Sequence, residues 1–140
     1  MGTYGESKIG LVRKVNEDSF YISHEKNVLA VADGMGGYVG GEIASKTAVE
    51  AIAYYFKNFS YAAPVQLEKA IQYANSSILS KTLIDPSLKG MGTTVSLVTL
   101  ARHMAFGATS ATAVSTYTAT GSSRRFLPTI PSSRSCSIRA

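Results

Sequence analysis

Three contrasting stretches follow one another between residues 28 and 59. Residues 28–32 (VLAVA) form a nearly continuous apolar run, which predicts a strand buried on both faces. Residues 34–41 contain five glycines and are expected to interrupt regular structure. Residues 41–59 repeat apolar side chains every four positions, which predicts an amphipathic helix. A buried strand that leads through glycines into such a helix indicates helices packed on a sheet.

The flanking sequence extends this pattern in both directions. Residues 18–23 and 27–33 are short apolar runs separated by a turn-prone segment, so they predict an antiparallel pair. Pro64 suits the first turn of a second helix, and residues 65–83 carry one apolar face. Residues 93–100 are apolar and β-branched and predict a further strand. The order of strands, two helices and a strand predicts a layered α+β domain.

Composition excludes several classes of protein. The chain has 140 residues, a length typical of one domain, and 45% of them are hydrophobic, as in globular proteins. No stretch is apolar enough to cross a membrane, and the first ten residues lack the core of a signal peptide. We therefore expect a cytoplasmic protein without a membrane partner. The single Cys136 cannot form an intramolecular disulfide and is expected to be a bystander.

The net charge of +5 lies entirely in the last part of the chain. Residues 1–100 hold nine Lys or Arg and nine Asp or Glu, so this part is neutral. The surplus is five arginines after residue 100, scattered among Ser, Thr and Ala without a helical face or interleaved aromatic residues. This distribution does not favour a nucleic-acid partner.

Three short motifs carry the chemistry: residues 13–18 (RKVNED), 32–37 (ADGMGG) and 90–94 (GMGTT). Taken alone, each has an ordinary explanation as a solvated turn or a turn next to a strand. A nucleotide-binding glycine loop is not favoured, because no Gly-Lys-Ser/Thr follows the glycines. An EF-hand is not favoured either, because no loop of alternating ligands closes with a glutamate at the right spacing.

Taken together, the motifs predict a cation site. Asp33 ends a predicted buried strand beside Gly34, so its carboxylate can meet a cation while backbone carbonyls approach the same ion. Glu17 and Asp18 begin the neighbouring strand and can converge on Asp33. Oxygen ligands of this kind suit magnesium or manganese rather than zinc. Arg13 offers the planar fork that binds a phosphate with two hydrogen bonds.

In their order and spacing these motifs resemble bacterial type 2C protein phosphatases, the metal-dependent PPM family. The resemblance covers residues 1–100 and rests on GLVR with NED (residues 10–13 and 16–18), VADGMGG (31–37) and GTT (92–94). It implies an α-β-β-α sandwich, in which two antiparallel sheets are flanked by helices and two metal ions sit at one end. This chain would hold an incomplete, N-terminal part of that fold.

The resemblance also implies roles for individual residues. Asp33 would bridge two manganese or magnesium ions, Gly34 would bind one of them through its carbonyl, and Glu17 would bind the same ion. Asp18 would orient metal-bound water, and Arg13 would hold the substrate phosphate. The implied reaction is metal-dependent hydrolysis of phosphoserine or phosphothreonine in proteins, by in-line attack of hydroxide held between the ions. The implied partners are phosphorylated proteins and a serine/threonine kinase.

Two positions modify this picture. Animal members of the family often carry a histidine, a candidate proton donor, where this chain has Met35, so here protonation of the leaving group would fall to water or another residue. For Gly92-Thr93-Thr94, a tight turn that opens a buried strand is a better explanation than a catalytic role.

A different class of function also stays open: a non-catalytic module, or pseudophosphatase, that binds phosphoproteins.

Residues 101–140 differ in texture from the rest, because they contain no acidic residue and are rich in Ala, Thr and Ser. One hypothesis is a disordered tail. The other is a frameshift near Leu100. When each codon is re-read from its third base, residues 106–121 permit the peptide WGHVGDSRVYLYRDG and residues 127–133 permit PDHSFV. HVGDSR and DHS are the next two motifs of the family. Because later aspartates complete the metal sites in the family, we expect the chain as written to be inactive and poorly folded.

Overall fold

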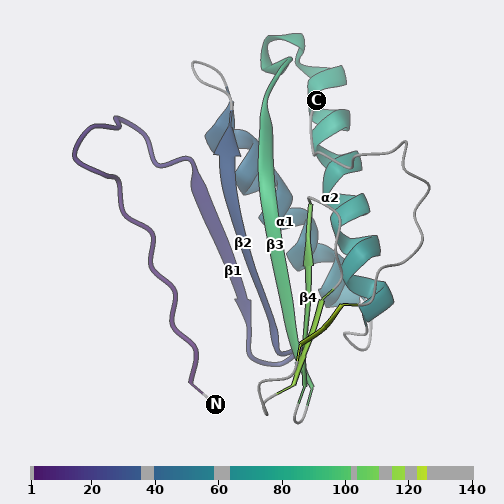
Figure 1. Ribbon diagram of the computed structural model, residues 1–140. Coiled ribbons are helices and arrows are strands. Elements are labelled where there is room, and N and C mark those ends of the chain that lie inside the picture. The colour runs from purple at the N-terminus through teal and green to yellow at the C-terminus, as the bar shows by residue number, and fades with distance from the viewer. Residues whose placement is uncertain are drawn as a thin grey trace.

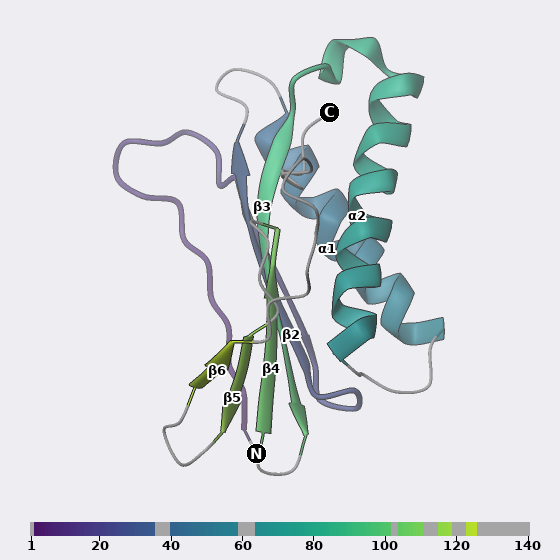
Figure 2. The same cartoon turned by 45° about the vertical axis from the view of Figure 1, so that its right-hand side comes forward.

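The computed structural model describes residues 2–35, 40–58, 64–101, 104–110, 115–118 and 123–125. One antiparallel sheet has its strands in the order β1 to β6, and two helices lie against one of its faces (Figures 1 and 2). The prediction of a mixed α+β layered fold is therefore confirmed. The elements are β1 (Asp18–Ser23), β2 (Val28–Met35), α1 (Gly41–Asn58), α2 (Pro64–Ile84), the 3₁₀ helix η1 (Pro86–Leu88), β3 (Gly92–Ala101), β4 (Met104–Thr109), β5 (Ser115–Thr118) and β6 (Ser123–Arg125).

The two helices form as the apolar periodicity predicts. α1 buries small residues and two aromatic rings, and Ala48, Ile52 and Phe56 are completely buried. Proline stands at the first position of α2, where its missing N–H costs no helical hydrogen bond. The helices are also joined by polar contacts: the Tyr55 hydroxyl donates to Gln66 Oε1, and Lys81 Nζ donates to Thr47 Oγ1 at 2.8 Å. No helix among the described residues is long and apolar enough to span a membrane.

Strand β2 is covered on one face only. Val28, Ala30 and Ala32 face the helices and are at most 2% exposed, whereas Val31, on the other face, is 58% exposed. The prediction that residues 28–32 are buried on both faces is therefore wrong for the structure described. Both helices pack on the same face, and no second layer lies over the other face within the described residues (Figure 2). We call the uncovered side the open face; it carries Asp18, Phe20, Leu29, Val31, Asp33, Met35, Thr94 and Ser96.

The glycine segment begins later than its composition predicts. Residues 34–41 were expected to break all regular structure, but β2 continues to Met35, with Gly34 opposite Thr93 in the pairing with β3. A strand partner therefore outweighs the low strand propensity of glycine here. Gly40 has a φ of +88°, and a Cβ there would lie 2.8 Å from Met91 Cβ. This tight turn delivers the chain into α1, while residues 36–39 lie outside the described part.

Three strands lie in the region after residue 100, where the sequence analysis predicted none. β4 pairs with β3, and Ser110 extends the contact because its N–H donates to the Val95 carbonyl at 2.9 Å. Its hydroxyl accepts from the Val95 N–H at 3.2 Å. β5 and β6 follow in the same sheet. Runs of Ala, Thr and Ser have no clear apolar alternation, so the strands had no visible signal. Cys136 lies outside the described residues.

Candidate metal and phosphate site

The predicted site residues border one cleft beside the end of β2. It is lined by Lys8, Ile9, Gly10, Arg13, Val15, Asn16, Glu17, Asp18 and Asp33. Four of the five predicted residues are in this set, although they come from the N-terminal segment, β1 and β2. The fifth, Gly34, follows Asp33 directly in β2.

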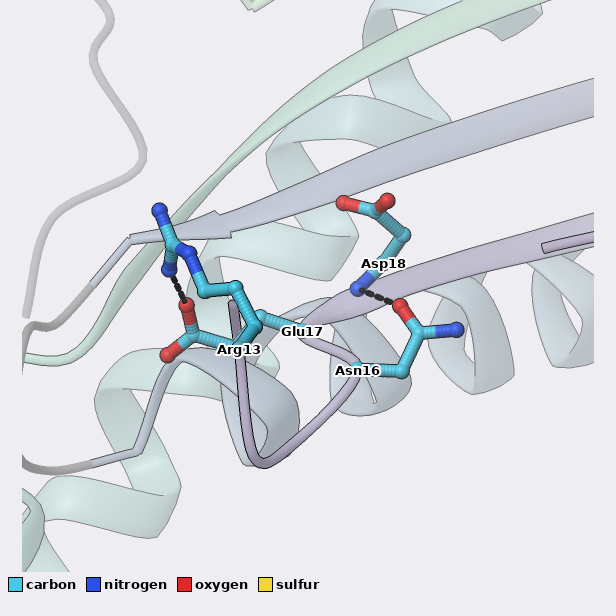
Figure 3. Close-up of polar contacts among 4 residues, drawn as sticks. All are labelled: Arg13, Asn16, Glu17 and Asp18. Carbon is cyan, nitrogen blue, oxygen red and sulfur yellow. Dashed lines mark hydrogen bonds and ion pairs between the residues drawn. The ribbon is translucent and has the colours of Figure 1, made fainter. Parts of the chain in front are cut away.

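Asp18 and Asp33 are brought together by strand pairing. They are Cα partners in the β1–β2 register, and both are exposed on the open face. The entry to β1 is shaped by Asn16, whose side-chain oxygen accepts from the Asp18 N–H at 3.0 Å (Figure 3). Asn16 Nδ2 in turn donates to Ser7 Oγ at 2.7 Å. The motif analysis assigned no role to Asn16, although an Asn two residues before a strand is a typical turn former.

Glu17 and Gly34 meet at the start of α1. The Gly34 N–H donates to the Glu17 carbonyl at 3.0 Å. The point where Gly41 would carry a Cβ lies 2.7 Å from Glu17 Oε1 and 3.2 Å from the Gly34 carbonyl carbon. The Glu17 carboxylate and the Gly34 carbonyl group therefore both lie close to the same point beside Gly41. The partial positive charge at a helix N-terminus also favours a carboxylate there.

Two glycines make this convergence possible. A Cβ on Gly34 would lie 2.2 Å from the Gly41 carbonyl oxygen and 2.6 Å from the Glu17 carbonyl oxygen, both backbone atoms. Side-chain rotation cannot relieve such contacts. The sequence analysis identified Gly34 as a residue whose carbonyl binds the metal. It gave Gly41 no role at the site, because the position of Gly41 inside a glycine run gave no separate signal.

Arg13 contacts Glu17 rather than standing apart from it. Its Nη1 donates to Glu17 Oε2 at 2.5 Å, four residues away (Figure 3). The Arg13 side chain is 71% exposed, so water weakens this ion pair and its contribution to stability is small. A guanidinium has five N–H donors. Binding Glu17 therefore leaves donors for a second anion in the same cleft.

The donor types fit a magnesium or manganese ion, because the candidate ligands are all oxygen atoms. The number of clustered side chains is small. Across the residues the structure describes, no three Asp, Glu, His or Cys side chains gather closely enough to hold an ion. In Figure 3 the Asp18 carboxylate lies apart from the Arg13–Glu17 pair. The site as described consists of Glu17 with Gly34 on one side and Asp18 with Asp33 on the other.

Comparison with known proteins gives consistent matches. PstP, a serine/threonine protein phosphatase of Mycobacterium tuberculosis, is 39% identical over 93 residues, which cover 66% of this chain and 18% of PstP. The serine/threonine phosphatase stp of Listeria monocytogenes is 33% identical over 94 residues, covering 61% of this chain and 37% of stp. The chain thus spans less than half the length of these relatives.

Solved structures agree with the sequence matches. The catalytic domain of PstP in complex with two manganese ions has a TM-score of 0.67 and 34% identity, and the match covers 77% of this chain and 46% of that domain. Stp1 of Staphylococcus aureus has a TM-score of 0.64 and 25% identity, with 77% and 43% covered. The family model of protein phosphatase 2C matches residues 11–124. This chain belongs to the protein phosphatase 2C family.

Proposed function

We propose that this chain carries the N-terminal part of the active site of a metal-dependent serine/threonine protein phosphatase. The observation that carries the proposal is the convergence of the Glu17 carboxylate and the Gly34 carbonyl group at the start of α1. Beside them, Asp18 and Asp33 stand opposite each other on the adjacent strands β1 and β2. This arrangement offers oxygen donors from two chain segments, residues 17–18 and 33–34, that are separate in sequence.

In this proposal each residue has one role. Glu17, Asp33 and the Gly34 carbonyl would hold the metal ions. Asp18 would orient water at the site by hydrogen bonding, and Arg13 would bind the substrate phosphate. When bound, two manganese or magnesium ions would activate water and offset the negative charge of the phosphoryl oxygens. The substrates would be proteins phosphorylated by a serine/threonine kinase in the bacterial cytoplasm.

We also propose that residues 101–140 result from a frameshift near Leu100. The support is the re-reading of residues 106–121 and 127–133, which permits two further family motifs in the correct order. Sequencing the DNA across codons 95–110 tests this directly. One missing or extra base supports the frameshift, and an intact frame that is confirmed in independent clones contradicts it.

The assignment of Asp33 is tested in the protein with its reading frame restored. Asp33→Asn should abolish manganese-dependent hydrolysis of a phosphothreonine peptide, because a neutral amide does not bridge two divalent cations as a carboxylate does. Asp85→Asn is the matched control, since Asp85 lies at η1 outside the cleft. Near-normal turnover by Asp33→Asn at saturating manganese would refute the role of Asp33.

Arg13→Ala should mainly raise KM for the same peptide, because it removes a contact made before the chemical step. Lys14→Ala removes the same charge from the adjacent exposed residue and should change KM little. An unchanged KM with a lower kcat would instead place Arg13 in transition-state stabilisation. Peptide binding by the restored protein without any turnover would favour the non-catalytic phosphoprotein-binding module.

A further inference from the structure

Thr93 is a buried residue to which the proposed function assigns no role. It lies on the helix-facing side of β3, is 1% exposed, and stands opposite Gly34 in the β2–β3 pairing. Its hydroxyl lies 2.9 Å from the Asp33 carbonyl oxygen and 2.9 Å from the Thr94 carbonyl oxygen. A threonine hydroxyl has one proton. It therefore donates to one of these oxygens at a time or is shared between them.

This contact is one of two that hold the same peptide group. The carbonyl of the Asp33–Gly34 peptide accepts from Thr93 Oγ1, and its N–H donates to the Glu17 carbonyl at 3.0 Å. Because a peptide group is planar, hydrogen bonds at both ends determine its orientation. Gly34 needs this restraint more than other residues would, since glycine has wide freedom in φ and ψ.

We infer that Thr93 is a positioning residue, whose hydroxyl orients the Asp33–Gly34 peptide so that the Asp33 carboxylate and the Gly34 carbonyl face the metal site. This inference rests on the proposed function, because it assumes that these two groups bind the ion. The proposed ligands lie on either side of the peptide that Thr93 contacts. A purely structural threonine would satisfy its hydroxyl without this relation to the ligands.

The same strand supplies a matched control. Thr99 also lies on the helix-facing side of β3 and is 1% exposed, but it stands opposite Val28 at the far end of the pairing. Replacing either threonine by valine removes a buried hydroxyl while keeping the side-chain shape. The Thr93 hydroxyl also makes hydrogen bonds that Thr93→Val removes, so the stability of each variant is measured separately. An effect on metal binding should appear at Thr93 only.

The experiment measures binding of Mn²⁺ to the 140-residue chain by water-proton relaxation, which requires no catalytic activity. Thr93→Val should weaken the Mn²⁺ affinity about tenfold, as is typical when a residue that orients a metal ligand is lost. Thr93→Ser, which keeps the hydroxyl, should stay within about twofold of the original chain, and so should Thr99→Val. Urea unfolding of each variant shows whether stability changes in parallel.

The outcomes separate this inference from the proposed function. If Thr93→Val binds Mn²⁺ as tightly as the original chain, or if Thr99→Val loses as much affinity, the positioning role is refuted and the proposed function stands. If the original chain binds no Mn²⁺, the inference is refuted together with the ligand assignment. If Thr93→Val does not fold, Thr93→Ser is compared with Thr93→Ala, which differs from it by the hydroxyl alone. Equal affinities in that pair refute the inference.

Discussion

The two faces of the sheet differ sharply, although the same strands form both. On the face toward α1 and α2, side chains such as Val28 and Ala30 are at most 2% exposed. On the open face, Phe20 is 40% exposed and Val31 is 58% exposed, and the exposed residues Asp18 and Asp33 lie on the same face. Alternate residues of one strand thus serve either the core or the site.

This difference indicates where stability and chemistry depend on each other. Most single changes on the covered face should alter the stability of the fold, and most changes on the open face should alter binding. The two meet at Gly34, which lies on the covered side but contacts Glu17 and Gly41 through its backbone. This division can be tested by making the same type of substitution on each face and comparing the two effects.

The largest effect is expected from a pair of phenylalanines. Phe56 of α1 is completely buried, so Phe56→Ala should lower the free energy of unfolding by about 3–5 kcal/mol, through lost burial and a cavity. Phe20→Ala, on the open face, should cost about 1 kcal/mol. Urea unfolding followed by circular dichroism measures both. Equal losses would show that the open face is covered in solution and would remove the contrast between the faces.

The second prediction concerns Gly34, where the two faces meet. Gly34→Ala should lower the free energy of unfolding by about 3 kcal/mol, because its Cβ would lie 2.2 Å from a backbone oxygen and the strand must shift. Gly10→Ala is the control: no atom lies within 4 Å of the added Cβ, so the change should stay within about 0.5 kcal/mol. A tolerated alanine at position 34 would contradict the close packing of β2 against the start of α1.

Much of this fold was predictable because its signals are local. The four-residue repeat predicted a helix over residues 41–59, and α1 spans Gly41–Asn58. The second predicted helix, residues 65–83, corresponds to Pro64–Ile84. The first two strands were also predicted within two residues of their ends. Periodicity and turn residues report on local structure, so they succeed without knowledge of the partner elements.

What escaped prediction depends on contacts between distant segments. The continuation of β2 through Gly34 requires β3, some sixty residues later in the chain, as its partner. The apolar run of residues 28–32 indicates apolar surface but does not say which layer covers it, so the run alone did not distinguish the covered Val28 from the exposed Val31. The roles of Gly41 and Thr93 likewise depend on backbone atoms of β2, which no motif shows. The ligand roles of Glu17, Asp18, Asp33 and Gly34 stay predictions.

The smallest effect is expected at Asp85, an exposed charged residue at the start of η1. Asp85 caps η1, whose Leu88 is buried, and its carboxylate accepts from Ser87 Oγ at 2.6 Å and from the Ser87 N–H at 3.0 Å. These hydrogen bonds, the side-chain one first, lower the pKa of Asp85 below its ordinary value of 3.8. The lowered pKa means that the folded state favours the ionised carboxylate. Its contribution to stability is therefore complete above the ordinary pKa and is lost as the pH falls through the lower, folded value.

Asp85→Asn removes this titration but keeps an oxygen that can cap η1. At pH 7 the urea midpoint should change little, whereas below about pH 4 the variant should lose less stability than the original chain for each further drop in pH. Ser87→Ala provides an intermediate case, since it removes the hydroxyl donor and keeps the backbone one. Urea midpoints between pH 6 and pH 2 measure all three proteins. Parallel curves for the original chain and Asp85→Asn would show that the ionised Asp85 carboxylate adds nothing to the acid sensitivity of the fold.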